Sequence, residues 1–131
     1  MTEHLLTIDN IQFGIRLTKI SRKADILDKY AKRTINGDLL REVIGTYYNY
    51  HLEFGYSDDV SRYMILWDKL TQPKAFHDIV IVDTIGKISF KGYIANVQDE
   101  IVYANPNDSM SRAFQSLSCD LVAKMPSRRA R

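Results

Sequence analysis

The chain has 131 residues, of which 45% are hydrophobic and 26% charged, as is usual for a soluble globular protein with a single core. Eighteen Lys and Arg stand against sixteen Asp and Glu, and this net charge of +2 does not suggest a surface built to neutralise many phosphates. A single cysteine excludes an internal disulfide and a cysteine metal cage, and no run of eighteen apolar residues predicts a membrane span.

The chain opens with two apolar runs, residues 5–8 and 11–17, separated by Asp9-Asn10. Asp and Asn tolerate the positive φ angles of tight turns between strands. The pattern predicts a hairpin at the beginning of the chain.

A longer hairpin is expected around Asn36-Gly37, the strongest short turn signal in the sequence. Residues 19–41 are charged, with both signs mixed, so we expect this hairpin to be partly exposed. Mixed charge favours contact with a copy of the same chain over a phosphate track. The predicted subunit-interface residues are Asn36, Gly37, Arg33, Arg41 and Tyr47.

Residues 44–54 show the clearest strand pattern, because apolar and polar positions alternate with a period of two. The side chains predicted to face the core are Ile44, Thr46, Tyr48, Tyr50, Leu52 and Phe54. Tyr47 then points outward, where it could be ordinary surface, part of a subunit interface or a ligand-stacking residue.

One helix is predicted over residues 57–71, with Ser57 as the N-cap and an end before Pro73. Its apolar positions repeat at helical spacing, so one face should lie on a sheet. These positions are Val60, Tyr63, Met64, Leu66, Trp67 and Leu70.

Three further segments complete the expected sheet. Residues 78–83 and 87–94 are predicted to pair across a turn at 84–86, and residues 105–108 read as a plain loop. Residues 115–123 form the last predicted strand, with one inward face. This face holds Leu117, Cys119, Leu121 and Ala123, so Cys119 should behave as a small buried hydrophobe.

No catalytic, metal or cofactor site can be read from the sequence. His51 and Glu53 share one face of a strand, a geometry open to acid–base chemistry but equally expected of a solvated face. His77 and Asp78 are adjacent on a strand and should point to opposite faces, so they should not orient one another. Asp99-Glu100 is read as surface charge. We therefore expect a protein that is not an enzyme.

The elements together predict a mainly β fold, a sandwich or barrel with one flanking helix. We expect one domain over residues 1–125 and a basic, flexible tail over residues 126–131. The first residues do not combine a positive leader with an apolar stretch, so we expect synthesis in a cytoplasm without a signal peptide.

The order of these elements resembles the tail proteins of prophages and tailed phages of Gram-positive bacteria. Residues 30–50 and 67–73 carry most of the resemblance. The segments concerned are Asn36-Gly37-Asp38-Leu39, Gly45-Thr46-Tyr47-Tyr48-Asn49-Tyr50 and Leu66-Trp67-Asp68-Lys69-Leu70. The resemblance implies a tail-tube-like fold of the kind found in tube and distal tail proteins, which has no catalytic residues.

The same resemblance implies a structural role in the tail or baseplate region of a virion, in rings that contact other tail proteins around a channel for DNA. An alternative from another class is a small β-barrel module that binds single-stranded nucleic acid or carbohydrate. That alternative rests on Tyr47, Tyr93, Tyr103 and Lys91.

Overall fold

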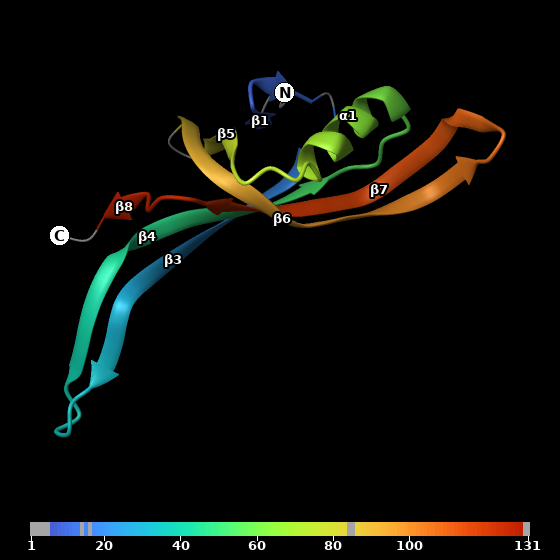
Figure 1. Ribbon diagram of the computed structural model, residues 1–131. Helices are drawn as coiled ribbons and strands as arrows, with labels where there is room; N and C mark the ends of the chain where they lie inside the picture. Colours follow the sequence, from blue (N-terminus) through green and yellow to red (C-terminus); the bar gives the residue numbers. More distant parts are fainter. Residues whose placement is uncertain (1–5, 14, 16, 84–85, 130–131) are drawn as a thin grey trace.

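The computed structural model describes residues 6–13, 15, 17–83 and 86–129 (Figure 1). Parts of the predicted opening hairpin (residues 5, 14 and 16), the turn at 84–85 and the last two residues of the predicted tail lie outside the described residues. The elements in chain order are β1 (Leu6–Ile8), β2 (Ile11–Gln12), β3 (Leu17–Arg33), β4 (Leu39–Phe54), α1 (Val60–Leu70), β5 (His77–Asp83), β6 (Gly86–Asn105), β7 (Asp108–Ala123) and β8 (Arg128–Arg129).

The strands form one antiparallel sheet in the order β2-β1-β5-β6-β7-β4-β3, with β8 beside β4. The first and last strands of this order do not pair in the described chain, so the sheet is open and does not close into a barrel. Helix α1 lies over one face of the sheet (Figure 1). The mainly β class with one flanking helix is confirmed, whereas a single open sheet takes the place of the expected sandwich or barrel.

The core lies between α1 and the sheet face that it covers. Leu117, Cys119 and Leu121 of β7 are fully buried and Ala123 is nearly so, which confirms the predicted inward face of the last strand. The other strands contribute Leu6, Ile8, Tyr50, Leu52, Phe54, Ile79 and Ile81. Burying each large apolar side chain stabilises the fold by roughly 1.5–3 kcal/mol, so this patch holds the sheet and helix together.

The opening hairpin is present around the predicted turn, but its second strand is only Ile11–Gln12, and Leu17, the end of the predicted second run, begins β3. Ile8 of β1 pairs with Ile11 of β2, and the two turn residues Asp9 and Asn10 have φ angles of 51° and 68°. Both angles lie in the left-handed region, which Asp and Asn enter more readily than other residues with side chains.

Strand β4 follows the predicted alternation only in its second half. Tyr50, Leu52 and Phe54 are buried, but Ile44 on the same face is 41% exposed. The reason is that α1 covers the sheet near Tyr50–Phe54 and does not reach the first half of the strand. The alternation of apolar and polar residues identified the inward face of β4 correctly, but it could not show how far along this strand α1 covers that face.

Helix α1 begins later than predicted. Asp59, not Ser57, is the N-cap, and its carboxylate accepts a hydrogen bond from the backbone N–H of Arg62 at 3.2 Å. Ser57 instead forms a β-bridge with Phe114 of β7. The helix buries Val60, Tyr63, Leu66 and Leu70, while Met64 is exposed and Trp67 only partly buried. The predicted apolar stripe is therefore correct except for Met64.

The carboxylate of Asp9 ties the first turn to α1 and β5. Its Oδ2 lies 2.7 Å from the buried His77 Nδ1 and 3.4 Å from the Nζ of both Lys69 and Lys74. Its Oδ1 accepts a hydrogen bond from the backbone N–H of Asp78 at 2.8 Å. Burial by itself raises the pKa of Asp9, but the hydrogen bonds from His77, Asp78 and Lys74 hold that pKa well below its usual range.

The end of the described chain lies against β4. The backbone N–H of Ser127 donates to the carbonyl of Thr46 at 2.8 Å, and β8 pairs with Gly45 and Thr46. A Cβ at Gly45 would lie 2.5 Å from the carbonyl oxygen of Arg128, so the strands approach this closely because residue 45 is glycine. The sequence predicts a flexible tail from residue 126, whereas the structure pairs Ser127 and β8 with β4.

Replacing Asp9 with Asn should lower the free energy of unfolding by about 1–3 kcal/mol at pH 7, because charged hydrogen bonds to partly buried groups are lost. The folded pKa of Asp9 lies below its ordinary value of 3.8, so this stabilisation is present above that pH and fades as the pH falls below it. Urea denaturation at pH 7 and near pH 3 measures both effects. Asp78→Asn is the control, since Asp78 pairs with Lys91 at the surface and should change stability by less than about 0.5 kcal/mol. An equal loss in both variants would contradict the role of Asp9.

Replacing Gly45 with Ala should detach β8 from β4, because the added methyl group cannot fit beside the Arg128 carbonyl. Hydrogen exchange at the Ser127 amide is the measurement, and we expect its protection to be lost. Gly37→Ala is the control: its φ of 86° makes alanine strained there, but a Cβ meets nothing within 4 Å and residue 37 lies far along the hairpin from Ser127, so protection at Ser127 should be kept. Unchanged protection at Ser127 in Gly45→Ala would show that the close approach is not required.

Candidate functional site

Two long hairpins extend beyond the covered part of the sheet, in opposite directions (Figure 1). Helix α1 has 11 residues, or about 16 Å at 1.5 Å per residue. Strand β6 has 20 residues, or about 66 Å at 3.3 Å per residue. One short helix therefore covers only the middle of the sheet, and both hairpin ends are two-stranded ribbons without cover.

The first arm, defined here as residues 27–44, is the end of the β3–β4 hairpin. The pairing of β4 with β7 covers Tyr50–Glu53, and its pairing with β8 covers Gly45 and Thr46. Beyond these, the described ladder joins β4 to β3 alone. Large apolar side chains are nevertheless exposed along the arm, namely Leu27, Tyr30, Ile35, Leu39, Leu40 and Ile44.

The tip of the first arm is well ordered by its own hydrogen bonds. Gly37 has a φ of 86°, and its backbone N–H donates to the carbonyl of Thr34 at 2.9 Å. Arg33 Nη1 donates to the carbonyl of Gly37 at 2.8 Å. The predicted hairpin around Asn36-Gly37 is confirmed, and Asn36 lies in its turn.

The predicted interface residues do not form one patch. Asn36, Gly37 and Arg33 lie at the tip, whereas Arg41 pairs with Asp28 at 2.6 Å further down the arm. Tyr47 lies at the base of the arm, opposite Asp25, and is only partly exposed. The structure therefore distributes these residues along the whole arm, and their role in an interface stays a prediction.

The second arm, defined here as residues 99–112, was not foreseen. Residues 105–108 were read as a plain loop, but they form the turn between two long strands, where Asn105 of β6 pairs with Asp108 of β7. The exposed apolar side chains of this arm are Ile101, Val102, Tyr103 and Met110. The run Ile101-Val102-Tyr103, rich in β-branched and aromatic residues, was the signal that a strand continues there.

The base of the second arm is joined to α1. The ring of Tyr63 stacks on that of Phe114 with centroids 4.0 Å apart, and the Tyr63 hydroxyl donates to the carboxylate of Asp99. Burial and this carboxylate raise the pKa of Tyr63. Asp99, expected to be simple surface charge, is therefore part of this joint, while Glu100 accepts a longer hydrogen bond from Gln115 at 3.4 Å.

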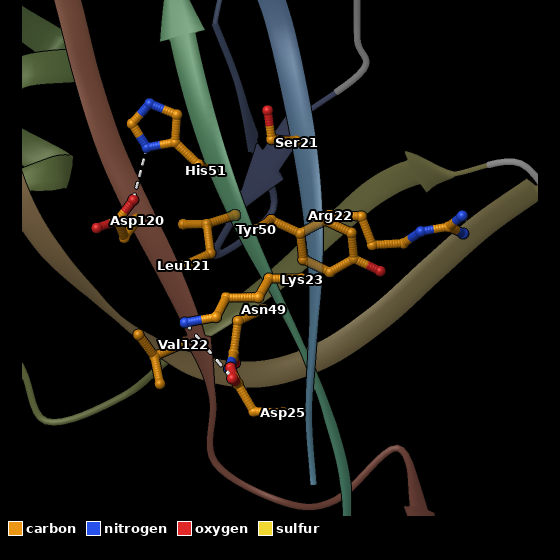
Figure 2. A pocket seen from close by; sticks show the side chains of 10 residues that line it. All are labelled: Ser21, Arg22, Lys23, Asp25, Asn49, Tyr50, His51, Asp120, Leu121 and Val122. Atoms are coloured by element: carbon orange, nitrogen blue, oxygen red, sulfur yellow. Dashed lines mark hydrogen bonds and ion pairs between the residues drawn. The ribbon is translucent and has the colours of Figure 1, made fainter.

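A pocket of about 480 Å³ opens where β4 separates from β7. Figure 2 shows its side chains, which come from β3, β4 and β7. Asn49 bridges the gap, since its Nδ2 donates to Asp25 at 2.7 Å and its Oδ1 accepts from the backbone N–H of Ala123 at 2.8 Å. A side chain thus takes the place of a backbone ladder bond at the point of divergence.

His51 is held between two carboxylates beside this pocket. Its Nδ1 lies 2.6 Å from Asp120 and its Nε2 lies 3.1 Å from Glu53, while Asn96 donates to the second oxygen of Asp120 at 2.7 Å. The hydrogen bond to Asp120 is the main cause of a raised His51 pKa, and Glu53 adds to it against the opposing effect of burial. Both ring nitrogens are engaged by acids, so His51 joins β4 to β7 and has no free nitrogen with which to activate a nucleophile.

The other side chains considered for a catalytic role are hydrogen-bonded or buried. His77 bonds to Asp9 and not to its neighbour Asp78, as the strand alternation predicted. Burial raises the pKa of the Cys119 thiol to about 12, so this group is a poor nucleophile. In the described part of the chain no cluster of three or more His, Cys, Asp or Glu side chains is placed to hold a metal ion.

The tyrosines proposed as a stacking platform are far apart. Tyr93 and Tyr103 lie on the same strand ten positions apart, which corresponds to about 33 Å at 3.3 Å per residue. Tyr47 lies on β4, at the base of the first arm. Stacked bases or sugar rings need neighbouring aromatic faces, which Tyr93 and Tyr103 do not provide together. The binding alternative itself stays a prediction.

Comparison with known proteins identifies no relative, because no protein-family model, curated protein or solved structure matches the chain. The helix that the structure describes is too short and too polar to cross a membrane.

The imidazole of His51 should titrate above its ordinary value of 6.5, and Asp120→Asn should lower this pKa more than Glu53→Gln does. Because the folded pKa is the higher one, the stabilisation from the charged ring is complete below the unfolded pKa and is lost as the pH rises through the folded pKa. Titration of the His51 ring by NMR measures these values. Asp25→Asn is the control, since Asp25 contacts Asn49 and Lys23 but not His51. An unchanged pKa in Asp120→Asn would show that the contact at 2.6 Å does not control the ring.

Proposed function

We propose that this protein is a structural component of the tail or baseplate region of a phage or prophage, and that it acts by assembling with copies of itself and with other tail proteins. The observation that carries the proposal is the pair of uncovered arms. The sequence resemblance to tail proteins of Gram-positive phages supports the same role and the tail-tube-like type of fold. In this role the protein has no enzymatic activity and no cofactor.

Physical chemistry supports assembly because a two-stranded ribbon is marginal by itself in water. The first arm exposes six large apolar side chains and the second arm four. Covering a side chain that is about half exposed would stabilise the complex by roughly 1 kcal/mol each. Large apolar side chains exposed in such numbers on uncovered ribbons favour contact with another protein surface.

The open sheet supports the same proposal. β3 is the last strand of the sheet order, so one edge of a 17-residue strand is unpaired in the described chain. Such an edge favours pairing with another chain. In the proposed ring, the channel would be lined by subunits side by side and would let DNA pass, and the protein, made in the host cytoplasm, would reside in the virion tail.

Leu40→Asp should abolish assembly, because it places a charge on the apolar surface of the first arm while leaving the covered core unchanged. The measurement is negative-stain microscopy and light scattering of concentrated protein, alone and with the products of neighbouring genes. Ile65→Asp on the exposed side of α1 is the control and should assemble like the unaltered chain. The proposal is contradicted if the unaltered protein forms no oligomer and enters no tail particle in any of these mixtures.

A further inference from the structure

We infer that the first arm of one copy docks on the second arm of another copy, in a head-to-tail contact that uses a different surface on each partner. This inference rests on the proposed assembly and names the surfaces that would meet. The two arms project from opposite ends of the sheet, so they cannot cover one another within a single chain (Figure 1). The exposed apolar side chains of each arm would therefore be covered by another molecule.

The apolar surfaces of the two arms are suited to each other. Tyr30 on the first arm and Tyr103 on the second are each 47% exposed, and further exposed apolar side chains lie along both arms. Desolvation, together with the nearby Tyr103 and Asp58, raises the pKa of Tyr56. Half-exposed tyrosines among apolar residues are typical anchors of protein interfaces.

The charges favour contact between unlike arms. The first arm carries four Lys and Arg against three Asp and Glu, and the salt bridge between Arg41 and Asp28 leaves Lys29, Lys32 and Arg33 against Asp38 and Glu42, a net charge of +1. The second arm carries three acids, Asp99, Glu100 and Asp108, against one arginine. Two first arms would bring like charges together, whereas a first and a second arm attract.

The placement of the arms determines what such a contact builds. If each arm bound its own counterpart, the contact would be symmetric and two copies would satisfy each interface. A contact between unlike arms leaves one free arm of each kind at the ends of every oligomer. It therefore continues until the chain of subunits closes into a ring or grows into a filament.

The test uses two full-length variants, each with one arm blocked: Tyr30→Asp for the first arm and Tyr103→Asp for the second. Each variant alone should be monomeric at concentrations where the unaltered chain forms oligomers, because its affinity for a second copy should fall at least about tenfold. An equal mixture should give heterodimers and nothing larger, because one intact first arm and one intact second arm remain. Sedimentation velocity of each sample is the measurement, with Ile65→Asp as the control and circular dichroism as the check of folding.

The outcomes separate the two proposals. Dimers of Tyr103→Asp by itself would show that first arms bind one another, which overturns the inference. A mixture that stays monomeric, although the unaltered chain assembles, would show that the arms dock elsewhere, which overturns the inference but leaves the proposed function standing. An unaltered chain that neither oligomerises nor enters a tail particle overturns both.

Discussion

The architecture depends on one constraint, the short reach of α1. A sheet face is stable where something covers it, and the only helix in the described chain spans about a quarter of the length of β6 at standard rises per residue. The stacked pair Tyr63 and Phe114 and the buried strand segments beneath α1 form the core. Outside this region the same strands continue as ribbons whose apolar side chains face water.

Polar contacts hold the edges that the core does not reach. The Asp9 carboxylate joins the first turn to β5 and α1, and His51 with Asp120 joins β4 to β7 where their ladder ends. Ser127 continues along β4 after β7 has left it. These contacts stabilise the sheet up to the beginning of each arm, so the arms emerge from a firmly held base. His51 and His77 each contribute one of these contacts.

A molecule of this shape is asymmetric in the way that a repeating assembly requires. Its two arms differ in length, in sequence and in the sign of their excess charge, and they leave the sheet in opposite directions (Figure 1). In the assembly proposed above, two unlike arms would give each subunit one surface to offer and another to receive. The charge difference also disfavours pairing of like arms.

The sequence by itself determined the elements whose signals are local. The Asp9-Asn10 and Asn36-Gly37 turns, the inward face of residues 115–123 and most of the apolar stripe of α1 follow from φ preferences and periodicity. Only the tertiary structure decided that Ile44 is exposed, that Asp59 caps the helix after Ser57 bridges to Phe114, and that His51 meets Asp120. Periodicity reports which face of a strand is apolar, but it does not report where the covering element ends. Where α1 stops covering the sheet depends on contacts between residues far apart in sequence. Because α1 is short, the two hairpins continue beyond it as uncovered arms.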